Sequence, residues 1–231
     1  MLSCTRSKRK RNPKIPGDRG VAQDGRTGYD RHMVAFRFKG DRLVADSSSL
    51  IYLAKSSLIR PFVGAFDVVV PALVFRECVR SGYPGSDEIR GLRREGLLSV
   101  RGICGDLESH LRLPRGGERE AIILFYQLGP DGLLIDDREG VRFCLRRGIP
   151  FLSALLVPSL LVVREIIGAE EARKSLERIV EVGRYSGSVI FFAREVLQKV
   201  SGGVDVFAPE ARIWEPPGET SQWRKPGEPS G

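Results

Sequence analysis

The sequence predicts an α/β protein whose mostly parallel central sheet is covered by helices on both faces. Short apolar runs rich in β-branched residues alternate with segments of helical periodicity over about 150 residues, which is the order typical of a parallel sheet. The run FDVVVP at residues 66–71 shows no polar alternation, as expected for a strand buried on both faces. Two of the apolar runs end on aspartate and lead directly into a helix. In open parallel sheets, such strand ends form the edge at which ligands bind.

The first predicted strand, LVA at residues 43–45, ends on Asp46. Three serines then begin a helix, because Ser is a preferred N-terminal cap residue and apolar residues follow at helical spacing: Leu50, Ile51, Leu53 and Ala54. After the second strand at residues 66–71, Pro71 is placed to start another helix, which is expected to stop at Gly82. Glu77 lies in the middle of this predicted helix.

The second half of the predicted sheet follows the same alternation. A short charged helix over residues 87–95 precedes a strand over residues 97–103. A glycine pair then opens a strongly apolar helix over residues 116–129. The run GLLIDD at residues 132–137 forms a strand that again ends on acidic residues, and a helix over residues 138–148 follows it.

The sequence predicts one folded domain with a less regular segment at each end. After a last short strand near residues 150–153, the pattern is helical over residues 154–200, in two or three segments. The predicted domain therefore spans residues 41–200. Residues 1–40 are expected to form a basic, disordered arm, and residues 201–231 form a tail rich in proline and glycine.

The overall composition is that of a soluble globular protein, with 42% hydrophobic and 29% charged residues in a chain of 231. The first 30 residues contain no long apolar segment, so no signal peptide is expected. Pro158 and the charged pair after Val163 interrupt the apolar run at residues 150–167, which predicts a buried helix and no membrane association. Four scattered cysteines and two histidines argue against a zinc site and a disulfide framework. We expect a cytoplasmic protein.

The positive charge of the chain is confined to its beginning. Residues 1–40 contain eleven Lys or Arg and three Asp or Glu, and the remaining residues balance at 26 of each sign, although the whole chain carries +8. This arm has three interpretations. It is a tether for nucleic acid or an anionic surface, a solvated disordered tail, or a segment that is not translated because Met33 is the true start.

Acidic residues occupy corresponding positions along the predicted sheet. Asp46 and the pair Asp136–Asp137 end strands, Glu77 lies on the helix after the second strand, and Glu118 lies in the first turn of a helix. Because strand ends and the starts of the following helices share one edge of a parallel sheet, we expect these carboxylates to converge. Converging carboxylates repel one another unless a cation neutralises them, and oxygen ligands without His or Cys suit Mg²⁺ or Mn²⁺. Such a site favours phosphodiester chemistry.

Polar neighbours of these acids are candidates for substrate binding. Ser47 and Ser48 are placed to hydrogen-bond a carboxylate, a water molecule or a phosphate. Arg138 and Arg142, one helical turn apart, are placed to hold phosphates, although a solvated helix face has the same spacing. Each acid also has a structural interpretation: the aspartates as helix caps or turn residues, Glu118 as a partner of its helix dipole, and Glu77 as a solvated side chain.

The segments ADSSSLIYLAK, VVVPALVFREC, GEREAI and LLIDDREGVRFCLRRG resemble PIN-domain proteins, and within them the prokaryotic branch related to VapC-type toxin ribonucleases. The resemblance covers residues 42–165. It implies a three-layer α/β/α sandwich with a mostly parallel sheet, Mg²⁺ or Mn²⁺ at an acidic site, and cleavage of single-stranded RNA. Matched position by position, the catalytic acids fall on Asp46, Glu77, Glu118 and Asp136. The metal ligands fall on Asp46, Glu118 and Asp136, with Asp137 as a substitute.

The resemblance also implies partners, namely single-stranded RNA, an antitoxin protein that blocks the acidic cleft, and a second copy in a homodimer. The sequence departs from the family pattern at two places: Ser49 stands where proline is common, and Ser153-Ala154 replace a Gly-Thr pair. Two rival interpretations stay open. One is a PIN-like module that binds RNA or a protein without cutting. The other is an unrelated α/β domain that uses Asp46 as a phosphate acceptor or small-ligand site, against which the missing glycine-rich phosphate loop argues.

Overall fold

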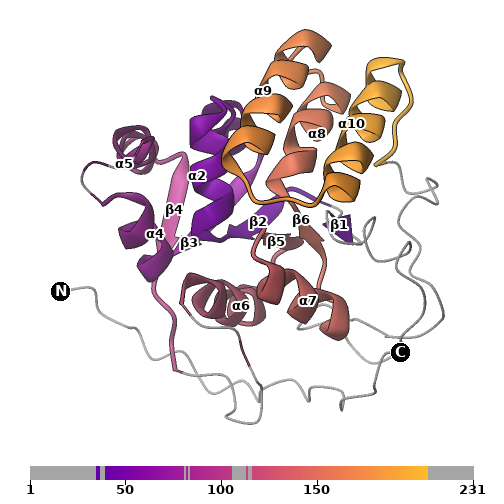
Figure 1. The fold of residues 1–231 in the computed structure, drawn as a ribbon. Helices are drawn as coiled ribbons and strands as arrows, with labels where there is room; N and C mark the ends of the chain where they lie inside the picture. The colour runs from indigo at the N-terminus through magenta and orange to yellow at the C-terminus, as the bar shows by residue number, and fades with distance from the viewer. Residues whose placement is uncertain are drawn as a thin grey trace.

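The computed structural model describes residues 35–36, 40–80, 82, 84–105, 113 and 116–207 (Figure 1). Most of the predicted arm over residues 1–40, including Met33, lies outside these residues, as does the predicted tail beyond residue 207. Trp214 and Trp223, which belong to that tail, are likewise outside the described part of the chain.

A six-stranded sheet in the order β1-β6-β5-β2-β3-β4 runs through the centre of the molecule. Five neighbouring strands are parallel, and β1 pairs antiparallel with β6 at one edge. This arrangement confirms the predicted mostly parallel sheet. The strands are β1 (Ala35–Phe36), β2 (Arg42–Ala45), β3 (Asp67–Pro71), β4 (Leu98–Arg101), β5 (Gly132–Leu134) and β6 (Phe151–Leu152).

Helices cover both faces of this sheet, which makes the predicted α/β/α sandwich (Figure 1). The helices α6 and α7 lie on one face, and α2, α3, α8, α9 and α10 lie on the other, while α4 and α5 lie towards the β4 edge. The helices are α2 (Ser47–Lys55), α3 (Ile59–Ala65), α4 (Ala72–Cys78), α5 (Ser86–Arg94), α6 (Gly117–Leu128), α7 (Arg138–Arg147), the 3-10 helix η1 (Ala154–Leu156), α8 (Val157–Val163), α9 (Ala169–Val182) and α10 (Gly187–Ser201).

Alternate side chains of each strand pack against the helical layer on one face of the sheet and the helical layer on the other. In β2, Leu43 and Ala45 belong to the hydrophobic core beneath α2 and α8, whereas Val44 belongs to the core beneath α6 and α7. All three side chains are fully buried. Successive side chains of a strand point to opposite faces, so an apolar run without polar alternation is required where both faces are covered.

Three details differ from the sequence prediction. Ala35–Phe36, inside the segment predicted to be disordered, forms the edge strand β1. The helix predicted to reach Gly82 ends at Cys78, with Val79 as its C-terminal cap. The helix α3 was not predicted, because this short segment contains Pro61 and Gly64, which are poor helix formers. Burial of its apolar side chains in the core stabilises α3 despite this weak local signal.

The apolar run at residues 150–167 is distributed over β6, η1 and α8, all of whose side chains up to Leu161 are buried, as predicted for this run. Among the described helices, none combines the length and the apolar character that a membrane span requires.

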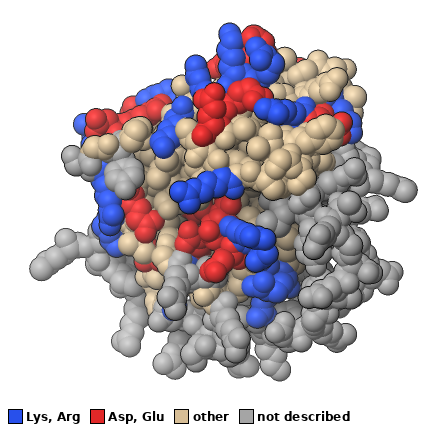
Figure 2. Space-filling view, viewed as in Figure 1, with Lys and Arg blue, Asp and Glu red and all other residues tan. Residues whose placement is uncertain are grey.

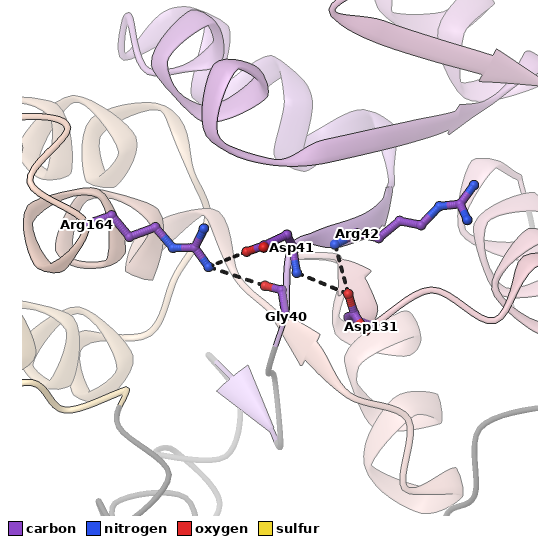
Figure 3. Close-up of polar contacts among 5 residues, drawn as sticks. All are labelled: Gly40, Asp41, Arg42, Asp131 and Arg164. Carbon is purple, nitrogen blue, oxygen red and sulfur yellow. Dashed lines mark hydrogen bonds and ion pairs between the residues drawn. The ribbon is translucent and has the colours of Figure 1, made fainter. Parts of the chain in front are cut away.

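Polar contacts fix the beginning of β2, at the end of the strand opposite to the acidic edge (Figure 3). The Asp131 carboxylate accepts hydrogen bonds from the backbone N–H groups of Asp41 and Arg42, both at 3.0 Å. Arg164, which follows α8, donates to Asp41 Oδ1 at 2.6 Å and to the Gly40 carbonyl at 3.4 Å. These contacts tie the strand that carries the first acid to two segments distant in sequence.

Candidate active site

The acids that follow β2 and β5 lie at the same edge of the sheet, as the sequence predicts. Ala45 pairs with Leu134 in the parallel ladder, and the next residue, Asp46, donates its backbone N–H to the Leu134 carbonyl at 3.0 Å. Asp136 follows Leu134 by two residues. The register of two parallel neighbours therefore brings these two carboxyl groups close together.

The side chain of Asp46 is fully buried and caps helix α2. Its Oδ1 accepts the backbone N–H of Ser49 at 2.9 Å, and its Oδ2 accepts the hydroxyl of Ser48 at 2.7 Å. Burial, and next the charge of Asp136, raise the pKa of Asp46 to about 7, although hydrogen bonds from both serines oppose this shift. The structural role as a helix cap is thus present together with the perturbed pKa that is typical of functional carboxyl groups.

Asp136 is the most heavily hydrogen-bonded carboxylate of the edge. Its Oδ1 accepts the hydroxyl of Tyr185 at 2.7 Å and a short hydrogen bond from the hydroxyl of Ser153. Its Oδ2 accepts the hydroxyl of Ser49 at 2.6 Å and the backbone N–H of Ala154 at 3.0 Å. Sequence reasoning assigned no site role to Ser49, Ser153 or Tyr185; it singled out the two serines only as departures from the family pattern.

Tyr185 lies in the segment between α9 and α10, which Figure 1 shows crossing in front of the sheet. Burial, followed by the charge of Asp136 and the hydrogen bond to it, raises the pKa of the Tyr185 hydroxyl well above its ordinary value. The Tyr185 ring packs against Tyr52 of α2, with ring centroids 5.8 Å apart. The hydroxyl is therefore held as a neutral donor that faces the acidic edge.

Asp137 caps the following helix. Its Oδ1 accepts the backbone N–H groups of Glu139 and Gly140, at 2.8 and 3.0 Å, and these groups open α7. The cap interpretation of the acid pair therefore holds for Asp137. Asp136, in contrast, makes its contacts with segments outside its own turn.

Glu118 and Glu77 lie where α6 passes close to α4. Gly117 allows this approach, because a methyl group in its place would lie 2.9 Å from Glu77 Oε2 and 2.9 Å from a methyl group of Val74. Glu118 is half-buried at the N-terminus of α6. Burial raises its pKa, and the charges of Asp137, Glu77 and Glu139 act in the same direction. The four predicted positions therefore share one face of the molecule.

The described carboxylates nevertheless do not form one cage. The charge of Asp136 acts on Asp46, and the charges of Asp137, Glu77 and Glu139 act on Glu118. Within the described part of the chain, no three His, Cys, Asp or Glu side chains are close enough together to hold one metal ion. The chemistry of the donors still fits a hard divalent cation, since all are carboxylates and mutual repulsion contributes to the raised pKa of Asp46 and of Glu118.

The predicted substrate contacts border this edge. Ser48 is bound to Asp46, and Ser47 is half-buried near the start of α6. Arg138 and Arg142 are exposed on α7, and neither forms an ion pair with another described residue. Figure 2 shows acidic atoms gathered in the middle of this face, with basic atoms above them and to their lower right. Arg184, beside Tyr185, is a further exposed cation that sequence reasoning did not single out.

Comparison with known proteins places the chain in a family. Residues 42–201, more than half of the chain, match the family model described as DUF3368: PIN domain, which is a nuclease-type fold. No curated protein and no solved structure is matched. The matched residues begin with β2 and end with α10, so they contain the whole acidic edge. With its parallel sheet, its two helical layers and this match, the chain belongs to the PIN-domain family.

Proposed function

We propose that this protein is a metal-dependent endoribonuclease that cleaves phosphodiester bonds of single-stranded RNA. The observation that carries the proposal is the buried Asp46, whose pKa is raised to about 7 at the carboxyl edge of a PIN-domain sheet beside further carboxylates. A buried carboxyl group next to like charges is costly for stability, and such an arrangement is typical of a functional site.

The acidic edge provides ligands for Mg²⁺ or Mn²⁺. Asp46, Glu118 and the pair Asp136–Asp137 are the proposed ligands, with Glu77 as a ligand or a base that acts through water. When bound, the divalent ion supplies Lewis-acid polarisation of a phosphoryl oxygen and a water nucleophile of lowered pKa. No other cofactor is proposed.

The chain itself orients the reacting groups. Ser48 and the backbone of Ser49 fix both oxygens of Asp46, so this carboxylate is preorganised. Glu77 is half-buried and not in an ion pair with another described residue, so it is placed to accept a proton from water. Arg138 and Arg142 contact phosphates on either side of the cleaved bond. Both are exposed, and a guanidinium group donates two parallel hydrogen bonds to the oxygens of one phosphate.

A second candidate function is a PIN module that binds RNA or a protein without cutting it. One observation favours this alternative: no three of the described acids are close enough together to hold one metal ion. Two partners rest on the resemblance alone: an antitoxin protein that blocks the acidic edge, which would make this chain the toxin of a pair, and a second copy in a homodimer.

Cleavage of a labelled single-stranded RNA in Mg²⁺, Mn²⁺ or EDTA tests the proposal. We expect cutting that requires metal and that is lost in Asp46→Asn. Asp67→Asn is the matched control, because Asp67 is exposed at the start of β3 and paired with Arg42 at 3.1 Å, at the opposite end of the sheet. Two results would favour the alternative of a PIN module that does not cut. One is binding of the RNA without cleavage in either metal, and the other is cleavage by Asp46→Asn as fast as by the wild-type protein.

A further inference from the structure

The hydrogen-bonding capacity of the Asp136 carboxylate is filled. A carboxylate oxygen has two lone pairs in its plane, and each oxygen of Asp136 accepts at least two donors, since the backbone N–H of Ala154 also lies 3.3 Å from Oδ1. These donors are the hydroxyl groups of Ser49, Ser153 and Tyr185 and the backbone N–H of Ala154. A direct bond to a metal ion would require Asp136 to give up at least one of them.

The neighbouring aspartates are less occupied. Each oxygen of Asp46 accepts one donor. In Asp137, Oδ1 accepts both backbone donors of α7, and Oδ2 has no hydrogen bond to another described residue. Lone pairs that can bind a cation thus remain on Asp46 and Asp137.

The donors of Asp136 come from three separate segments of the chain. One of these donors, Ser49, also contacts Asp46. The Ser49 hydroxyl donates to Asp136, while the Ser49 backbone N–H donates to Asp46. A continuous path of hydrogen bonds therefore runs from the Tyr185 hydroxyl through Asp136 and Ser49 to Asp46. Proline at position 49 would provide neither of the two donors of Ser49.

We propose that Asp136 is a positioning residue, held by Tyr185, Ser153 and Ser49, that orients Asp46 without binding the metal ion. This inference rests on the proposed function for the presence of a metal site. It changes one assignment there: Asp136 is removed from the proposed ligands, which leaves Asp46, Glu118 and Asp137. Tyr185 couples the segment between α9 and α10 to that site. Residues that hydrogen-bond the ligands of a metal ion fix the orientation of those ligands and raise the affinity of the site for the ion.

Titration with Mn²⁺ distinguishes a metal ligand from a positioning residue. The concentration of unbound Mn²⁺ is measured by its electron paramagnetic resonance signal. We expect Asp46→Asn to lose measurable binding, and Asp136→Asn and Tyr185→Phe each to weaken it only about tenfold. The double variant should bind as Asp136→Asn alone does. Tyr52→Phe, the matched control, should bind as wild type does, because the Tyr52 hydroxyl forms no hydrogen bond within the described part of the chain.

A second readout needs no metal. In EDTA, the losses of unfolding free energy in Tyr185→Phe and Asp136→Asn should be non-additive, since both variants alter the one hydrogen bond between these residues. Tyr185→Phe removes its donor, and Asp136→Asn removes the charge of its acceptor. The inference is overturned if the two losses simply add, or if Asp136→Asn abolishes Mn²⁺ binding as completely as Asp46→Asn while remaining folded. Absence of Mn²⁺ binding by the wild-type protein refutes the metal ligation on which the inference depends, and with it the proposed function. Non-additive losses of unfolding free energy in EDTA would then still support the hydrogen bond between Tyr185 and Asp136.

Discussion

The carboxyl groups of Asp46 and Asp136 share one hydrogen-bonding partner, Ser49, which donates its backbone N–H to the first at 2.9 Å and its hydroxyl to the second at 2.6 Å. The parallel pairing of β2 with β5 places the two acids side by side. Only Asp46 is completely buried, and the charge of its neighbour adds to the effect of burial on its pKa. This relationship gives the pH dependence of stability a definite sign.

The contribution of Asp46 to the stability of the metal-free protein should fall as the pH rises from about 4 to 7. The pKa of Asp46 is about 7 in the folded protein and 3.8 ordinarily, so within this range the folded state binds a proton that the unfolded chain has released. The contribution of Asp46 to the free energy of unfolding therefore falls with rising pH, by at most about 4 kcal/mol for a shift of this size. Above pH 7 the contribution of Asp46 is constant.

Urea unfolding in EDTA at several pH values, for wild type and Asp46→Asn, isolates this contribution. The amide keeps the helix cap and has no charge, so the variant should be more stable than wild type at pH 8. The difference between the two proteins should shrink towards pH 4. Paired acids such as Glu170, whose pKa is lowered, cancel in this comparison because both proteins contain them. A difference that is independent of pH would contradict the assignment of the raised pKa to Asp46.

Gly117→Ala should disturb the acidic edge through α4. The added methyl group would lie 2.9 Å from Glu77 Oε2 and from Val74, so the Glu77 side chain must move and the buried contact with Val74 must loosen. We expect a loss of about 1–3 kcal/mol in unfolding free energy and weaker Mn²⁺ binding. Gly102→Ala is the control, because a methyl group there meets open space. Unchanged Mn²⁺ affinity in Gly117→Ala would separate Glu77 from the metal site.

Much of the fold could be predicted because its signals are local. Uninterrupted apolar runs identify strands covered on both faces, and the aspartates that follow them identify the shared edge. The helix α3 could not be predicted in this way, because Pro61 and Gly64 are poor helix formers in a segment of seven residues. Its place depends on side chains such as Phe62, which is fully buried in a core built from distant segments.

The candidate site was predictable in its positions but not in its bonding. Strand ends and helix starts specify where the acids lie, so Asp46 and Asp136 could be placed on one edge from the sequence. The partners of Asp136 depend on tertiary structure, because Tyr185 is 49 residues away and reaches the edge only after α8 and α9 have packed. Ser153 follows β6, whose pairing with β5 brings it to Asp136. No local sequence pattern predicts contacts between such distant segments.

Gly40→Ala should weaken the anchor at the beginning of β2 (Figure 3). Gly40 has a φ of +107°, and a methyl group there would lie 2.3 Å from the Asp131 carboxyl carbon. The carboxylate must then leave the N–H groups of Asp41 and Arg42, which costs about 2 kcal/mol or more in unfolding free energy together with the backbone strain. Gly64→Ala, in an exposed helical position with open space, should instead stabilise by about 0.5–1 kcal/mol. Equal effects of the two substitutions would show that Asp131 does not hold the strand.

Arg142→Gln should weaken RNA binding uniformly across sequences and reduce its dependence on salt. Arg142 and Arg138 are exposed one turn apart on α7, beside the acidic edge, so each is placed to neutralise one phosphate. Loss of one such contact lowers the slope of log affinity against log salt by about 0.7 for a single strand. Fluorescence anisotropy with a short RNA in the Asp46→Asn background, which is expected not to cut, measures this slope. Arg94→Gln, on α5 at the β4 edge, is the control and should leave it unchanged. An unchanged slope in Arg142→Gln would identify the arginine face of α7 as a solvated surface.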